Sequence, residues 1–156
     1  MAENSATISI QATMLPDEIA KTFSGSMIVS PADASEKWYY KLTAITTTSA
    51  DLIAGAYLDY TAVDQDTAPT AVATGDKIKF LFVQNQSTTD GIMLSIDAGT
   101  AVNSLADGIF IGPSQTWFAR LPNVTVADLH AISSDIGDVG DATANAVVIA
   151  LLDDVG

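Results

Sequence analysis

The sequence contains no cysteine, one histidine and only six basic residues among its 156. Without thiols, a disulfide scaffold, a cysteine zinc site and a cysteine nucleophile are all excluded. A single imidazole also excludes the usual ligand sets of zinc, copper and iron sites. Nucleic-acid binding depends on Lys and Arg side chains that neutralise phosphates, so a net charge of −13 argues against a nucleic-acid partner.

Long apolar runs and helix signals are scarce as well. The longest uninterrupted apolar run, Ala146–Leu152, has seven residues, whereas a bilayer crossing needs roughly 20, so we expect no membrane partner. The first residues, Met1–Ser5, have neither the basic nor the apolar region of a secretory signal, and we expect none. Sixteen of the nineteen acidic residues are Asp, which favours turns over helix surfaces.

Apolar and polar residues alternate with a period of two in many short segments. This pattern predicts an all-β fold, an antiparallel β-sandwich of jelly-roll type with eight to ten short strands and at most one or two short helical turns. We expect one domain over residues 1–156. Within it, residues 1–12 would form an N-terminal arm or edge strand, residues 16–21 one helical turn, and residues 61–74 a long loop.

Individual strands can be placed more closely. Residues 77–85 and 144–152 are apolar on both faces, which predicts central strands of a sheet. The polar segment after residue 85 leads into an alternating run at 92–97, so these two strands should form a hairpin. In the strand at 37–47 we expect Trp38, Tyr40 and Leu42 to face the core, which leaves Tyr39 pointing outward with the lysines.

The single histidine, His130, is the first candidate for catalysis. A hydrolytic site would pair it with Asp128 and with Ser133 or Ser134, but strand alternation places Ser133 on a different face from His130. The chain also lacks a Gly-x-Ser-x-Gly nucleophile turn. We therefore expect a half-buried structural histidine bonded to neighbouring backbone, and a protein that is not an enzyme.

Two binding sites remain open from the residues alone. Asp135, Asp138 and Asp141 are candidate calcium ligands, since calcium accepts six to eight oxygens, but they lack EF-hand spacing and equally suit a solvated acidic loop. Exposed aromatic side chains, Tyr39 and Trp117 among them, could stack against a sugar and make the protein a carbohydrate- or cell-surface-binding module. No cofactor is expected.

Three stretches carry a resemblance to a known family. A strand ends in Val83-Gln84-Asn85, a second leads into Ile96-Asp97-Ala98-Gly99, and an Ile111-Gly112-Pro113-Ser114 turn precedes an aromatic strand. Over about residues 75–134 the chain resembles small β-sandwich virion proteins of tailed bacteriophages, in particular head decoration (cement) proteins. Neck, tail and head-fibre proteins are neighbouring possibilities.

The resemblance implies a structural protein on the exterior of a virion capsid. It would bind the major capsid protein as a homo-oligomer, for which we expect a trimer, and so stabilise the capsid lattice. Symmetric oligomers suit a repeated lattice, and sparse charge suits extensive interfaces. The interface candidates are Ile8, Ile10 and Met14 in the N-terminal segment, together with the outward-pointing Tyr39.

Overall fold

A computed structural model describes residues 5–14, 21–33, 35–56, 71–102, 108–135, 138–139 and 143–153, with the backbone alone described for Met14, Asp135, Asp138 and Val139. These residues form eleven strands and one 3₁₀ turn, and every strand pair is antiparallel, which confirms the all-β prediction. Of the expected helical turn at 16–21, residues 16–20 lie outside the described residues and Lys21 begins a strand; most of the expected loop at 61–74, residues 61–70, also lies outside them. The chain divides into two compact units, Met1–Asp33 and Ala34–Gly156.

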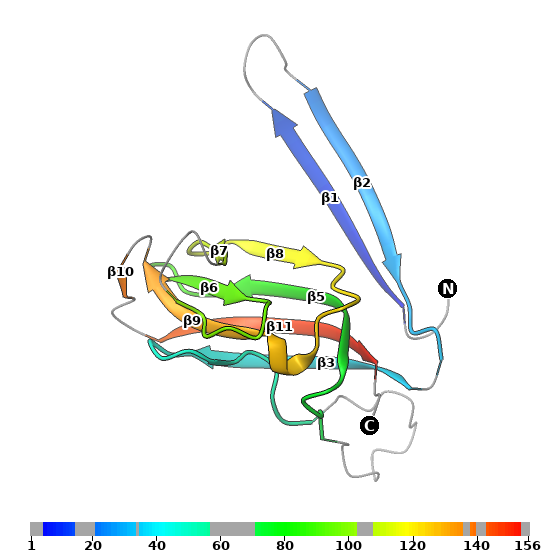
Figure 1. Ribbon diagram of the computed structural model, residues 1–156. Helices are drawn as coiled ribbons and strands as arrows, with labels where there is room; N and C mark the ends of the chain where they lie inside the picture. The colour runs from blue at the N-terminus through cyan, green and yellow to red at the C-terminus, as the bar shows by residue number, and fades with distance from the viewer. Residues whose placement is uncertain are drawn as a thin grey trace. The chain divides into compact units, whose positions relative to one another are not determined.

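The first unit is a single long β-hairpin (Figure 1), made of β1 (Ala6–Met14) and β2 (Lys21–Val29). Its register pairs Ala6 with Val29 at one end and Met14 with Lys21 at the other. The expected strand at residues 6–12 is therefore confirmed, and it pairs with the next strand along the chain. Side-chain contacts between strand ends add to the ladder, with the Ser5 and Ser30 hydroxyl oxygens 2.8 Å apart.

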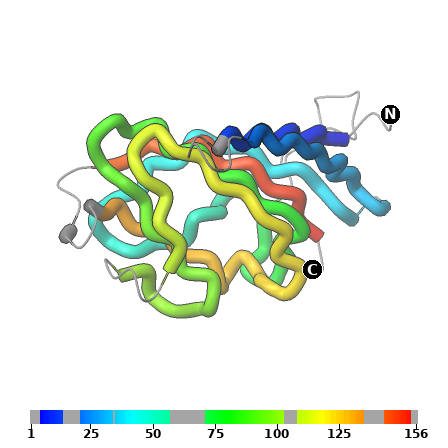
Figure 2. The backbone as a smooth tube through the Cα atoms, turned by 90° about the horizontal axis from the view of Figure 1, so that it is seen from above, coloured from blue at the N-terminus to red at the C-terminus, as the bar shows by residue number. Residues whose placement is uncertain are grey.

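The second unit contains two antiparallel sheets. The first has the order β3 (Glu36–Ile45), β11 (Ala144–Asp153), β5 (Lys77–Asn85), β8 (Thr116–Ala119). The second has the order β10 (Asp138–Val139), β9 (His130–Asp135), β6 (Gly91–Ser95), β7 (Ile109–Ile111), and the short β4 (Ala50–Asp51) also pairs with β9. The 3₁₀ turn, η1 (Val126–Asp128), leads directly into β9. Figure 2 shows how the strands of this unit surround a common interior.

Side chains from both sheets fill that interior, which makes the unit a β-sandwich. The first sheet contributes Leu81, Val83, Val148 and Leu152, and the second contributes Ile92, Leu94, Ile111 and Ala131, all of which belong to one buried cluster. The prediction that 77–85 and 144–152 are central strands is confirmed, because β11 lies between β3 and β5, and β5 lies between β11 and β8. Strands with apolar residues on both faces fit such positions.

A β-bulge in β5 changes which of its residues face the core. Leu151 pairs with Phe80 whereas the next residue, Leu152, pairs with Ile78, so Lys79 is the extra residue in the ladder. A bulge of this kind shifts the alternation by one position. Ile78 therefore joins the core cluster with Leu81, while Phe80 lies on the opposite face.

The expected hairpin between residues 77–85 and 92–97 is wrong. β5 and β6 belong to different sheets, so the connection between them crosses from one layer of the sandwich to the other. Asn85, 1% exposed, holds this crossing: its Nδ2 donates to the carbonyl oxygens of Asp90 (2.8 Å), Gly112 (3.1 Å) and Ile111 (3.3 Å), and its Oδ1 accepts from Ser87 N (2.9 Å). The Asn85 side chain thus provides hydrogen bonds to backbone groups in the connection between the two sheets, where strand pairing cannot provide them.

Close strand packing explains one glycine in the second sheet. A Cβ added at Gly91 would overlap the ring of Phe110 and lie 2.7 Å from the carbonyl oxygen of Ser134. Gly25 in the first unit differs, because a Cβ there would meet nothing within 4 Å. Only the first of these glycines is required by the surrounding atoms.

Candidate functional site

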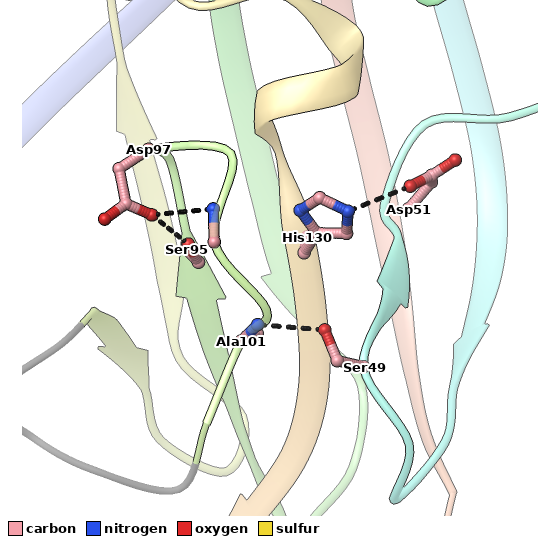
Figure 3. Close-up of polar contacts among 7 residues, drawn as sticks. Ser49, Asp51, Ser95, Asp97, Ala101 and His130 are labelled. Carbon is pink, nitrogen blue, oxygen red and sulfur yellow. Dashed lines mark hydrogen bonds and ion pairs between the residues drawn. The ribbon is translucent and has the colours of Figure 1, made fainter.

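His130 lies at the start of β9 between a strand on either side. Its register partners are Asp51 on β4 and Ser95 on β6, so the three residues share one face of the sheet. Its Nε2 lies 3.2 Å from Asp51 Oδ1, as Figure 3 shows. Its Nδ1 is buried and has no hydrogen-bond partner among the described residues. The expectation of a half-buried strand histidine is confirmed, but its partner is a carboxylate, not backbone.

Two further carboxylates near His130 are held by local hydrogen bonds. Asp97 Oδ1 accepts from Ser95 Oγ at 2.6 Å and from Gly99 N at 3.1 Å, and these two bonds, the hydroxyl first, lower the pKa of Asp97. Asp128 Oδ2 accepts from the backbone N and the hydroxyl of Thr125, both at 2.8 Å, which lowers the pKa of Asp128. A protonated His130 adds a smaller electrostatic contribution in the same direction to both.

The cluster does not form a serine–histidine–aspartate relay. Such a relay needs a serine hydroxyl hydrogen-bonded to the imidazole, whose other nitrogen is held by the carboxylate. In Figure 3 the Ser95 hydroxyl donates to Asp97 and His130 contacts Asp51, so the two pairs are separate. Ser133 and Ser134, the other candidates, are fully buried. The His130–Asp51 contact joins β9 to β4, while the Ser95–Asp97 bond joins β6 to the turn that follows it.

The calcium candidates fall largely outside the described residues. Asp135 and Asp138 are register partners in the short β9–β10 pair, their side chains are not described, and Asp141 lies outside the described residues. Among the described residues, no group of three or more His, Cys, Asp or Glu side chains is placed to hold a metal ion. The calcium site therefore stays a prediction.

The expected orientation of the strand at 37–47 is wrong. Tyr39 is 1% exposed and belongs to the core, whereas Tyr40 and Leu42 are 52% and 59% exposed. The Tyr39 hydroxyl donates to Ala54 O at 3.0 Å and accepts from Ala54 N at 3.3 Å, and its pKa is raised chiefly by burial. Tyr39 is therefore unavailable as an interface residue or as a sugar platform.

The volume left by the neighbouring strand explains this inversion. Across from Tyr39 in β11 is Ala150, which is also a core residue. A small residue at this position leaves room for the large Tyr39 side chain. Lys41 shares this face of an edge strand and still reaches a polar partner, since its Nζ donates to Ala54 O at 3.2 Å. The position of the lysines in β3 therefore does not show which face of the strand points to solvent.

The hairpin of the first unit has one apolar and one polar face. Cross-strand partners share a face, and the apolar face, which we call the arm face, consists of Ala6, Ile8, Ile10, Ala12, Phe23, Gly25, Met27 and Val29. The opposite face is built from Thr, Ser and Gln apart from Ile28. Lys21, the single charged residue in the two strands, lies two positions before Phe23 and therefore on the arm-face side, at the last register position of the hairpin. Ile10 and Phe23 are 41% and 53% exposed.

Two of the three sequence-predicted interface residues in this segment are placed on the arm face. Ile8 is half-buried and Ile10 is exposed, while nothing is described of the Met14 side chain. Phe23, the most exposed large residue of the arm face, was missed because the sequence did not lead us to expect a strand at residues 21–25. Alternation of Phe23, Gly25, Met27 and Val29 was the signal that could have located it.

Of the three motifs that carry the phage resemblance, the first is the end of β5, and the other two contain turns. Asn85 of the first motif binds the carbonyl of Gly112 in the third. Asp97 of the second accepts from Gly99 N, and Ala98 between them adopts a φ of 65°. These residues shape the sandwich, and no ligand-binding role follows from their contacts.

None of the described segments forms a helix with the length and apolarity that crossing a membrane would need. Comparison with protein-family models, with curated proteins and with solved structures finds no match to this chain.

Proposed function

We propose that this chain is a structural virion protein that decorates and stabilises a phage capsid from the outside, and that its β1–β2 hairpin is the arm that docks on the capsid lattice. The arm face carries the proposal. It combines nine-residue strands, exposed Ile10 and Phe23 side chains, and a single charge in the two strands. The partner is the major capsid protein, bound by several copies of the chain.

A two-stranded hairpin is by itself only marginally stable in water, because two strands alone cannot bury an apolar face. A surface that covers the arm face would remove this deficit. Full burial of a Phe or Ile side chain is worth about 1.5–3 kcal/mol, so covering the exposed halves of Ile10 and Phe23 contributes about 2 kcal/mol together. Repetition over a lattice and over an oligomer multiplies such modest contacts.

The electrostatics support the same function. Of the chain's six basic residues, only Arg120 lies beyond Lys79, against nine Asp, so the C-terminal half is strongly anionic. An anionic exterior opposes non-specific association, while the nearly uncharged arm face is free to meet another protein. His130 Nε2 contacts Asp51, and its Nδ1 has no hydrogen-bond partner among the described residues. These contacts give no reason to assign catalysis.

Co-sedimentation with capsids tests the proposal. Capsids assembled from the major capsid protein of the same virus should bind the purified chain, and Ile10→Ser combined with Phe23→Ser should weaken binding at least tenfold. The matched control, Gln11→Ala with Ser24→Ala, changes a cross-strand pair on the polar face and should bind as the wild type does. Equal binding by both double variants, or no binding by the wild type, would refute the proposal.

A further inference from the structure

The hairpin of the first unit leaves one edge of β1 free (Figure 1). β1 pairs with β2 alone in a two-stranded sheet, so it has no second partner strand among the described residues. Alternate residues of such an edge direct their backbone N–H and C=O groups away from the sheet. The side chains of residues 9–13 in this strand are exposed. β1 therefore presents an unpaired row of backbone donors and acceptors along its nine residues.

This edge lacks the features that usually prevent a strand from pairing with another chain. Natural edge strands are blunted by lysines, by proline, by a bulge or by their shortness. β1 contains no charged residue, no proline and no glycine, and its register with β2 continues without a shift from Ala6 to Met14. The other strand of the hairpin differs, because β2 begins with Lys21 and has Gly25 at its centre.

The edge strands of the second unit do have such features. Among the described residues they are β4 and β10 with two residues each, β7 with three, β8 with four, and β3, which carries Lys37 and Lys41. Strand addition between molecules uses long, unprotected edges. Within the part of the chain that the structure describes, β1 is the strand that offers such an edge.

We infer that β1 pairs along its free edge with β1 of a second copy of this chain, antiparallel and about a two-fold axis. A two-fold contact uses the same edge on both copies and is closed, so no further chain is added. When the two strands overlap fully, Ile10 lies opposite Ile10 of the second copy, Ile8 opposite Ala12, and Ser9 opposite Gln11. Apolar residues thus meet apolar residues, and the arm face continues across four strands.

Pairing supplies what the hairpin alone lacks. Two strands by themselves are marginally stable, whereas three or more strands with an apolar face reach independent stability. Two nine-residue strands paired over their whole length form about 8–10 backbone hydrogen bonds, because each hydrogen-bonded residue pair exchanges two. A typical protein–protein interface contains about 10 direct hydrogen bonds. A second copy provides a strand of the required length, alternation and lack of charge.

Measurement of the molar mass in solution tests the pairing on the full chain. At about 100 µM the wild type should have twice the 16.2 kDa of one chain. Ser9→Lys combined with Gln11→Lys sets lysines opposite lysines across the two-fold axis, so dimerisation should weaken at least tenfold. The matched control, Ser24→Lys with Ser26→Lys, adds the same charges to the register partners on β2 and should remain dimeric. A monomeric or trimeric wild type, or equal molar masses for the two double variants, would overturn the inference.

Hydrogen exchange identifies the paired edge without any substitution. In the wild-type dimer, consecutive backbone amides of β1 should all be protected, whereas along β2 only the alternate amides that bond to β1 should be. A dimer with the same alternate protection in both strands would use another surface and would contradict the pairing. A monomer whose β1 edge becomes protected only when capsids are added would assign the edge to a strand of the capsid protein, which also overturns it.

The inference does not rest on the proposed function, because the β1 edge and the arm face are different surfaces of the hairpin. A dimer that fails to bind capsids removes only the function. Capsid binding by a chain that stays monomeric removes only the strand pairing.

Discussion

Replacement of Asn85 should be among the most destabilising single polar changes in the second unit. Its side chain is 1% exposed and donates to the carbonyl oxygens of Asp90, Ile111 and Gly112, while it accepts from Ser87 N. Asn85→Ala removes the equivalent of two or more hydrogen bonds, each worth about 1 kcal/mol net, and leaves at least one buried carbonyl unsatisfied at about 1–3 kcal/mol. We therefore expect a loss of about 3–4 kcal/mol in the free energy of unfolding.

Urea unfolding followed by tryptophan fluorescence measures this loss. With a slope of about 2 kcal/mol per molar urea for a chain of this size, the midpoint should fall by about 2 M. Gln86→Ala is the matched control, because Gln86 is exposed and donates only to the neighbouring side chain of Gln84; its midpoint should change by less than about 0.3 M. A loss below about 1 kcal/mol for Asn85→Ala would refute the role assigned to this side chain.

Asn85→Asp refines the test. The ionised carboxylate keeps an acceptor for Ser87 N but presents acceptors to three carbonyl oxygens, so at pH 7 it should destabilise more than Asn85→Ala does. Protonation restores one O–H donor. The difference between Asn85→Asp and the wild type should therefore narrow as the pH falls toward 4, and a difference that does not change with pH would contradict this geometry.

Three further predictions follow from the contacts of the second unit and from the hairpin. Gly91→Ala should lower the free energy of unfolding by about 2 kcal/mol or more, because the new methyl group would overlap the Phe110 ring and the Ser134 carbonyl oxygen. Gly25→Ala should not destabilise the protein, because nothing lies within 4 Å of a Cβ at that position. Equal losses of stability for the two variants in urea unfolding would be evidence against this packing. Tyr39→Phe should cost about 1 kcal/mol through loss of the hydroxyl bonds to Ala54, and an unchanged melting curve would show that these bonds contribute nothing. The pKa of Asp97 is lowered on folding, so the stability that this carboxylate contributes is complete above its unfolded pKa near 3.9 and is lost as the pH falls through the lower folded pKa. The urea midpoint of Asp97→Asn should therefore decline less below about pH 4 than that of the wild type. Identical pH profiles for the two proteins would show that Asp97 does not cause the decline.

Much of the hairpin unit was predictable because its pattern is local. Ile8 and Ile10 alternate with polar residues, and two antiparallel neighbours in sequence pair without help from distant segments. The central position of β11 was equally readable, since Val147 and Val148 belong to a run that is apolar on both faces. The missed residue, Phe23, lay in a run whose alternation is interrupted by Gly25, which contributes no side chain to the pattern.

The failures arose where distant segments meet. The expected hairpin failed because the β5–β6 connection crosses between sheets, where Asn85 binds the backbone of a turn whose other half lies near Gly112. His130 found its partner in Asp51, 79 positions earlier in the chain, through the β4–β9 pairing. No short window of sequence contains both members of any of these contacts.

The sequence by itself determined the fold class and the alternation of the first strand, because both follow from the pattern of apolar and polar residues within a few positions. Tertiary structure decided which face of β3 is buried. A period of two shows that Tyr40 and Leu42 share a face, but not that the core lies on the other side. Ala150 of β11 lies opposite Tyr39 and leaves the space that its ring fills, so Tyr40 and Leu42 are exposed on the other face.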